Sequence, residues 1–171
     1  TLSAFSAGTS LSAARNKHST VVYNRKLYVL GGYDNAGTKS NTVYIATPAL
    51  NGSTGAWSSG TNLPVSVSNH SALVTNGMIA VMGGTVGATL SNTVYYSSAD
   101  VLSWTASPNL LYDYLKDGAA FSGNGQIYYC GGVNLSATPL LNCRYANLTL
   151  TANYVTNGSF VSMPFYELGA E

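Results

Sequence analysis

Three short apolar runs recur along the chain, each four residues long and without a polar interruption. They read Leu-Tyr-Val-Leu at 27–30, Ile-Ala-Val-Met at 79–82 and Ile-Tyr-Tyr-Cys at 127–130. A half-buried strand alternates apolar and polar residues, because successive side chains point to opposite faces of the sheet. A run without alternation therefore predicts a strand that is buried on both faces, as in a sheet packed between two others.

Each apolar run follows a second predicted strand across a tight turn. In the first unit, strand a covers 19–23 and strand b covers 27–30, with Asn-Arg-Lys at 24–26 between them. The later units turn at Asn76-Gly77 and Asn124-Gly125. Asn-Gly favours the type I′ hairpin turn, which needs positive φ at both central residues. The pattern thus predicts an antiparallel hairpin at the start of every unit.

The unit is an internal repeat. The segment 18–32 returns as 70–84 and in weaker form as 118–132, at offsets of 52 and 48 residues. Strand c at 41–46 and strand d around Trp57 complete a unit of four strands. The segment 5–11 aligns with 57–63, and therefore reads as the last strand of a preceding unit. The predicted boundaries are 1–14 for that outer strand, 15–63, 67–110 and 117–163 for three complete units, and 164–171 for a tail.

A glycine pair, a tyrosine and a tryptophan mark the units at loose spacing. These residues are Gly31, Gly32, Tyr44 and Trp57 in the first unit, Gly83, Gly84, Tyr95 and Trp104 in the second, and Gly131, Gly132 and Tyr145 in the third. The third unit has no tryptophan, and Tyr154 is the predicted substitute. This signature resembles the kelch repeat, which forms one blade of a β-propeller.

The resemblance implies an all-β, kelch-like propeller segment of three four-stranded antiparallel blades plus the outer strand of a preceding blade. The glycine pairs would end strand b where neighbouring blades leave little room for side chains. The tyrosines and tryptophans would bridge adjacent sheets, so Trp57 and Trp104 should pack between blades. The resemblance does not select a function, because kelch propellers serve as enzymes, lectins and protein-docking platforms.

The two cysteines, Cys130 and Cys143, allow two interpretations. They are either buried free thiols or a disulfide between the end of strand b and the start of strand c, and we predict the disulfide. A disulfide requires an oxidising compartment, which favours a secreted or cell-surface protein. A metal site is not expected, because there are only two thiols and both histidines are distant in sequence.

Charge is scarce, with 13 charged residues among 171 and a formal net charge of +1. There is no basic stripe of the kind that nucleic-acid binding requires, so no nucleic acid is expected as a partner. No apolar run approaches the roughly 20 residues of a membrane span, so no membrane insertion is expected. The sequence shows neither an initiator methionine nor a signal peptide, which indicates a processed or excised chain.

Catalytic groupings are missing from the sequence. The two histidines, His18 and His70, share one repeat position at the entry to strand a, where we expect them to satisfy backbone groups. No Ser-His-Asp set and no phosphate-binding loop can be assembled. We therefore expect no catalytic residue, metal or cofactor, and no enzymatic activity from this chain by itself.

Charged residues concentrate in two kinds of loop, the b–c loops and the d–a loops that enter the next strand a. Both kinds lie on the same face of an antiparallel blade, and we place 7 of the 13 charges there. One interpretation is that long loops simply hold charges. The other is a recognition face of charged and aromatic residues, with the candidate binding residues Arg15, Lys17, Tyr33, Asp34, Lys39, Tyr112, Asp113 and Tyr114.

The predicted function is a non-catalytic, extracellular recognition or structural module that binds a protein or glycan through these loops. The alternative is part of a larger kelch-type propeller enzyme, an oxidase or carbohydrate-active enzyme, with catalytic residues outside this segment. An arc of three blades exposes two sheet faces, and such faces invite association. The expected partners are therefore the rest of a longer propeller chain or further copies of this chain.

Overall fold

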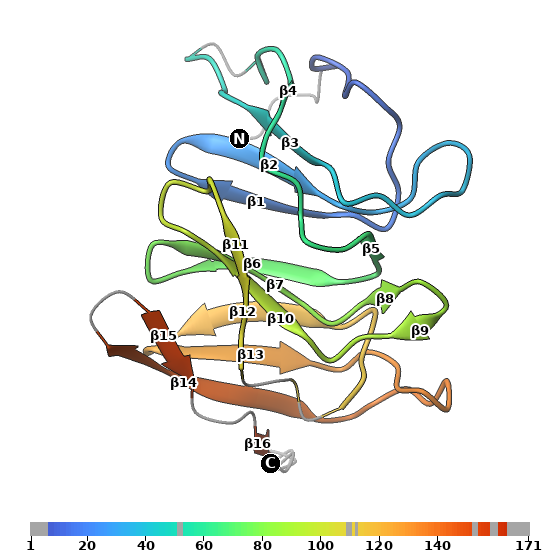
Figure 1. Ribbon diagram of the computed structural model, residues 1–171, viewed down its shortest axis with the longest axis vertical. Coiled ribbons are helices and arrows are strands. Elements are labelled where there is room, and N and C mark those ends of the chain that lie inside the picture. Colours follow the sequence, from blue (N-terminus) through green and yellow to red (C-terminus); the bar gives the residue numbers. More distant parts are fainter. Residues whose placement is uncertain are drawn as a thin grey trace, which may run out of the picture.

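The computed structural model describes residues 7–50, 53–108, 111, 113–151, 154–157 and 161–163. These residues contain β-strands and loops, and no helix that could cross a membrane. Three antiparallel sheets follow one another along the long axis of the molecule, in the order of the three repeats (Figure 1). The predicted all-β, kelch-like segment of three blades is therefore confirmed, and each sheet is called a blade below.

Each blade begins with the predicted hairpin and continues outward through strands c and d. Blade 1 has the order β1-β2-β3-β4, with β1 (Ser19–Tyr23), β2 (Lys26–Leu30), β3 (Val43–Ala46) and β4 (Ser58–Ser59). Blade 2 has the order β6-β7-β10-β11, with β6 (Ser71–Thr75), β7 (Met78–Met82), β10 (Val94–Ser97) and β11 (Trp104–Ala106). Blade 3 contains β12 (Ala119–Gly123), β13 (Gln126–Cys130), β14 (Cys143–Thr151), β15 (Tyr154–Asn157) and β16 (Val161–Met163).

The hairpin turns at 76–77 and 124–125 have the predicted geometry, and the first turn is one residue shorter than predicted. In blade 1, Tyr23 pairs with Lys26, so the turn consists of Asn24 and Arg25, with φ of 47° and 60°. Asn76-Gly77 and Asn124-Gly125 also have positive φ at both residues. Asn24-Arg25 thus adopts the same backbone as Asn-Gly, with Arg25 in the left-handed region that glycine occupies in the other two turns.

A small sheet in the loops was not predicted. It consists of β5 (Val67–Ser68), β8 (Thr85–Val86) and β9 (Thr89–Leu90), in the order β5-β8-β9. It lies on the side of the molecule where the b–c loops of all three blades gather, opposite the a–b turns (Figure 1). The b–c and d–a loops therefore share one face, and we call it the loop face.

The third blade departs from the sequence alignment at strand c. Val29 pairs with Tyr44, and the corresponding Val81 pairs with Tyr95, but Tyr129 pairs with Arg144. Arg144, and not Tyr145, therefore stands where the first two blades have their tyrosine. The predicted equivalence of Tyr145 with Tyr44 and Tyr95 is wrong by one residue, because the alignment followed the aromatic side chain and not the strand register.

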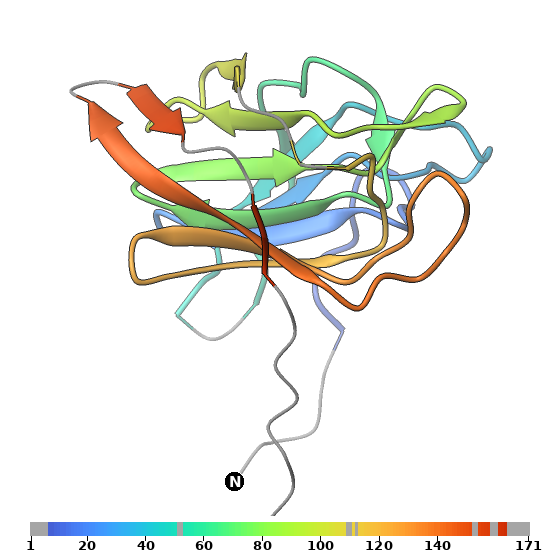
Figure 2. The same cartoon turned by 90° about the horizontal axis from the view of Figure 1, so that it is seen from below.

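Strand d of the third blade also differs. Trp104 lies opposite Ser97, two residues beyond Tyr95, whereas Tyr154 lies opposite Thr151, at the far end of β14. Tyr154 therefore does not take the register position of a tryptophan. The reason is that β14 is longer than its counterparts and forms an extra hairpin with β15, which projects beyond the other sheets on the side of the a–b turns (Figure 2).

Two apolar cores lie between the three blades. The core between blades 1 and 2 contains Tyr28, Leu30, Val43, Leu63, Val67, Ile79, Val81 and Val101. The core between blades 2 and 3 contains Leu73, Ala80, Met82, Val94, Leu111, Leu115, Ile127, Tyr129 and Ala146. Fully burying one such side chain contributes about 1.5–3 kcal/mol, so these interfaces hold the segment together.

Burial along strand b follows the neighbours of each blade. In the central blade, Ile79 to Met82 are all buried, as the unbroken apolar run predicts. In blade 3, burial alternates along β13, and Tyr128 and Cys130 are only half-buried. The prediction of burial on both faces therefore holds in the central blade and fails in β13, where the described residues place a sheet on one side only. It also holds at Tyr28, Val29 and Leu30 of β2, although blade 1 likewise has a described sheet on one side only.

Candidate functional site

The loop face carries a cationic and aromatic group of residues on blade 1. Tyr33 forms isolated β-bridges to Asn16 and to Lys39, which brings the entry segment and the b–c loop together. The ammonium groups of Lys17 and Lys39 lie 5.4 and 5.5 Å from the centre of the Tyr33 ring, within the range of cation–π attraction. Lys39 Nζ also donates to the carbonyl of Gly87 in the b–c loop of blade 2.

Arg15 joins this group from the entry segment. Its guanidinium lies 5.3 Å from the centre of the Tyr44 ring, and Nη2 donates to the hydroxyl groups of Thr42 at 2.8 Å and Tyr44 at 3.2 Å. Arg15, Lys17, Tyr33 and Lys39 are called the Tyr33 patch below. The Ser68 hydroxyl, together with Lys39 and Lys17, lowers the pKa of the Tyr33 phenol. The patch thus favours negative charge at the loop face.

Asp34 holds the shape of its own loop. Its carboxylate accepts hydrogen bonds from the backbone N–H groups of Ala36 at 2.9 Å and Thr38 at 2.8 Å. Asn134 makes the same pattern in blade 3, to Ser136 and Thr138. Because an Asx turn of this kind is a structural device, the structure gives Asp34 a role in positioning Tyr33 and Lys39.

A second group forms where the entry segment of blade 3 meets its b–c loop. Asp113, Tyr114, Asn134, Leu135 and Ser136 line a shallow cavity of about 140 Å³. Beside it, the buried guanidinium of Arg144 pairs with the carboxylate of Asp113. Of the other predicted residues here, Tyr112 lies outside the described residues. Within the described part of the chain, no hydrogen bond or ion pair joins this cavity to the Tyr33 patch.

Arg144 is the residue of this region that the sequence did not reveal. The register would have identified it, because the Asn142 carbonyl accepts from Gly131 as those of Thr42 and Thr93 accept from Gly31 and Gly83. Arg144 follows Asn142 by two residues, as Tyr44 follows Thr42 and Tyr95 follows Thr93. Arg144 therefore occupies the tyrosine position of the repeat.

The acidic residues of the loop face pair with a cation or hold a turn, whereas the cations of the Tyr33 patch contact hydroxyl groups, a carbonyl and aromatic rings. The Asp117 carboxylate lies 3.5 Å from the ammonium group of Lys116, and it also accepts a hydrogen bond from the Asn69 side-chain amide. Asp34 and Asp113 are held as described above. Among the described residues, Arg15, Lys17 and Lys39 have no carboxylate within 4.0 Å. The Tyr33 patch therefore carries uncompensated positive charge.

The two histidines lie at the entries to strands a, and one of them is buried. His70 is 6% exposed. Burial, and then the charge of nearby His18, lower the pKa of His70 to about 4, so it is neutral at pH 7. Burial and the charge of Arg15 also lower the pKa of His18. A backbone hydrogen bond with Leu30 acts in the opposite direction and raises the pKa of His70, so the expectation that the histidines satisfy backbone groups stays a prediction.

Packing against the glycine pairs explains the histidine position. A Cβ added to Gly84 would lie 2.8 Å from the His70 Cβ and 2.6 Å from the Ser68 carbonyl oxygen. Gly84 has φ of 87°, which side chains rarely adopt. The histidine at the strand entry therefore closes over a glycine that has no room for a side chain.

The predicted disulfide is present between Cys130 and Cys143, which are register partners in blade 3. The two tryptophans occupy equivalent places at the outer edges of their blades. Trp104 packs against the core between blades 1 and 2, and its indole N–H donates to the Thr61 carbonyl at 3.1 Å. Trp57 lines an apolar groove on blade 1 instead. No cluster of three or more metal-ligating side chains occurs among the described residues.

Comparisons with known proteins agree with this geometry. The kelch motif family model matches residues 14–64. No curated protein matches the chain. Among solved structures, "Structure of YjhT" is similar over 90% of this chain and 48% of that chain, with a TM-score of 0.72 and 16% identity. This chain thus spans about half the length of that structure. The chain has the fold of a kelch-like β-propeller segment, with the kelch motif matched in its first blade and the same blade architecture built twice more.

Proposed function

We propose that the chain is a non-catalytic recognition module that binds a negatively charged protein or glycan through its loop face. A kelch propeller module fits a binding or structural role, and the charge of the Tyr33 patch favours binding. Three cations and one tyrosine gather there without a carboxylate partner among the described residues. An anionic group would complete that charge through charge-assisted hydrogen bonds, which are stronger than neutral ones.

A secreted or cell-surface location is part of this proposal. The disulfide between Cys130 and Cys143 supports it, since such bonds persist in oxidising compartments. Non-reducing mass spectrometry of protein from its source would test the location.

The binding test is an array of paired acidic and neutral glycans and acidic and neutral peptides. We expect the acidic members to bind, and the Lys17→Ala/Lys39→Ala double variant to lose that binding. The matched control is Arg25→Ala/Lys26→Ala, which removes the same charge from the a–b turn on the opposite side of the molecule and should bind normally. Equal loss in both variants would contradict the proposal, because the effect would then come from net charge alone.

A further inference from the structure

Five Asn-x-Ser/Thr motifs occur in the sequence, which is the pattern that asparagine glycosylation requires, at Asn51, Asn69, Asn134, Asn147 and Asn157. A motif this short also occurs by chance, so its meaning depends on its surroundings in the folded chain. A glycosylated site needs an accessible amide nitrogen, an accessible hydroxyl two residues later, and open space around both. The structure describes all three side chains of the motif only at Asn69 and Asn134, and these two motifs differ in every one of these conditions.

Asn134 forms an Asx turn at the start of the b–c loop of blade 3. Its side-chain Oδ1 accepts hydrogen bonds from the backbone N–H groups of Ser136 at 3.0 Å and Thr138 at 3.1 Å. Because backbone N–H groups only donate, the side-chain atom that faces them is the oxygen, and the amide nitrogen Nδ2 is left over. Among the described residues, neither this Nδ2 nor the Ser136 hydroxyl makes a hydrogen bond. The turn therefore leaves free the atom that would carry a sugar.

Blade 1 shows that the turn itself does not require this motif. Asp34 makes the same two bonds, to the N–H groups of Ala36 at 2.9 Å and Thr38 at 2.8 Å. A carboxylate in the first position and an alanine in the third thus serve the turn equally well. What Asn134 and Ser136 supply in addition is an amide nitrogen and a hydroxyl, the two groups that define the motif.

The space around Asn134 is open. Asn134 and Ser136 line the shallow cavity of about 140 Å³ together with Tyr114 and Leu135. Leu135 is 65% exposed and Tyr114 is 46% exposed. A sugar on Nδ2 would stand beside these two side chains and cover apolar surface that otherwise faces solvent.

The motif at Asn69 lies in the opposite environment. Its Nδ2 donates to the carboxylate of Asp117, and the Ser71 hydroxyl donates to the Gly118 carbonyl. Ser71 is 7% exposed, and His70 between them is 6% exposed. The amide nitrogen is engaged and the hydroxyl is buried, so the folded chain does not present this motif to solvent.

We propose that Asn134 is an N-glycosylation site and that Asn69 is not. The inference rests on the proposed secreted or cell-surface location, because it requires a sugar donor of the secretory route, an oligosaccharide carried on a polyprenyl diphosphate. The bond from the anomeric carbon to the diphosphate oxygen breaks, and the anomeric carbon forms a bond to Nδ2. The amide nitrogen gives up one proton, and the lipid diphosphate leaves with the bonding electrons. Oδ1 is unchanged, so the Asx turn persists in the product.

A glycan at Asn134 would divide the loop face. It would stand at the blade 3 end, beside Asp113 and Tyr114, which line the same cavity. The Tyr33 patch lies on blade 1, and within the described residues no hydrogen bond or ion pair links that patch to the cavity. The modification thus covers one end of the face and leaves the cationic end open for recognition.

Peptide mass spectrometry of protein from its source, kept under non-reducing conditions, tests the site. A peptide N-glycosidase in heavy-oxygen water converts a glycan-bearing asparagine to labelled aspartate, and we expect the label at Asn134 and not at Asn69. An unmodified Asn134 in protein with an intact Cys130–Cys143 disulfide would overturn the inference and leave the proposed location standing. Reduced cysteines would contradict the location, and the inference would fall with it.

Variants of the full chain, expressed in a glycosylating secretory host, separate the motif from the turn. Asn134→Asp keeps the turn, as Asp34 does in blade 1, but removes the amide nitrogen, and Ser136→Ala removes only the hydroxyl. We expect both to lose one glycan from the intact mass, with the urea midpoint of the enzymatically deglycosylated parent, whereas Ser136→Thr keeps the glycan. The matched control Ser71→Ala destroys the motif at Asn69 and should keep the full mass. A glycan lost in Ser71→Ala, or none lost in Asn134→Asp, would overturn the inference.

Discussion

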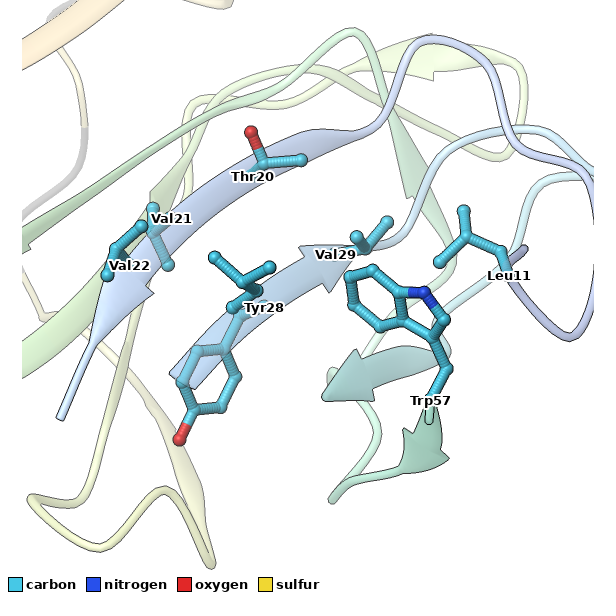
Figure 3. Close-up of a pocket in the computed structure, with 8 residues that line it drawn as sticks. Leu11, Thr20, Val21, Val22, Tyr28, Val29 and Trp57 are labelled. Carbon is cyan, nitrogen blue, oxygen red and sulfur yellow. The ribbon is translucent and has the colours of Figure 1, made fainter. Parts of the chain in front are cut away.

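The junction between blades 1 and 2 and the open face of blade 3 are built from the same repeat positions but differ in their surroundings. At the junction, Leu30 is fully buried and its register partner Val43 is too. At the open face, the corresponding pair is Cys130 and Cys143, both half-buried and joined by a disulfide. The neighbouring blade supplies the burial at this position, whereas Val29 of blade 1 is buried on the side without a blade, where Trp57 and Leu11 lie beside it (Figure 3).

The largest effect should come from the glycine pair at a closed junction. Gly83 and Gly131 have nearly equal φ, 67° and 66°, so alanine adds the same backbone strain at both. Only at Gly83 does the new Cβ meet a backbone carbonyl, that of Leu115, at 2.6 Å. We expect Gly83→Ala to cost about 4 kcal/mol of unfolding free energy and Gly131→Ala about 1–2 kcal/mol. Urea unfolding measures both free energies. Equal losses would show that the Leu115 carbonyl adds nothing to the cost of alanine at Gly83.

The disulfide should matter because blade 3 has no apolar pair at that position. Closing a loop of about 15 residues contributes about 3 kcal/mol in the chain-entropy model. We therefore expect the Cys130→Ala/Cys143→Ala double variant to lose about 3 kcal/mol of unfolding free energy, measured by urea unfolding without reductant. Adding reductant to the unchanged protein should give a similar loss, and full stability in reductant would contradict this role.

A pH dependence should arise at the junction between blades 1 and 2, where His70 is buried. Its folded pKa is about 4, below the ordinary 6.5, so between these values the unfolded chain binds a proton that the folded chain does not. Stability therefore falls as pH falls from 6.5 to about 4, by about 3 kcal/mol. His70→Gln should flatten this slope more than His18→Gln does. Equal slopes in the unchanged protein and in His70→Gln would exclude the effect.

A smaller effect should come from the serine that ties strand a to the next blade. Ser19 donates to the His70 carbonyl at 2.6 Å, and Ser71 donates to that of Gly118. The third repeat has Ala119 at this position. We expect Ser19→Ala and Ser71→Ala each to cost about 1 kcal/mol, and Ala119→Ser to change the unfolding free energy little. A gain at Ala119→Ser as large as those losses would mean that blade 3 finds an acceptor within this chain.

The sequence was sufficient for the features that depend on local geometry. The Asn-containing turns, the glycine pairs and the apolar runs each fix backbone conformation or burial within a few residues, so the repeat and the hairpins could be predicted. The strand register of blade 3 could not. The alignment placed Tyr145 at the tyrosine position of the repeat because Tyr145 is aromatic. Arg144 occupies that position instead, through its pairing with Tyr129. This pairing is a long-range contact, which no local pattern encodes.

For the candidate site, only the face of the molecule that carries it could be predicted from the sequence. The sequence placed Arg15, Lys17, Tyr33 and Lys39 in loops of one face. The structure brings Lys17 and Lys39 over the Tyr33 ring, and Arg15 over the ring of Tyr44. The sequence could not show that Asp34 is used within its own turn, or that Asp113 belongs with Arg144. Those partners are set by how two loops approach each other, and loop approach depends on the packing of the blades beneath them.

Amide hydrogen exchange at the equivalent glycines tests most directly whether the neighbouring blade supplies these interactions. In the isolated chain at a concentration low enough to keep it monomeric, Gly84 N–H donates to the Leu115 carbonyl, whereas Gly132 N–H has no acceptor among the described residues. We expect slow exchange at Gly32 and Gly84 and fast exchange at Gly132. Equal protection at Gly132 would contradict it, because the blade would then satisfy that group without a neighbour.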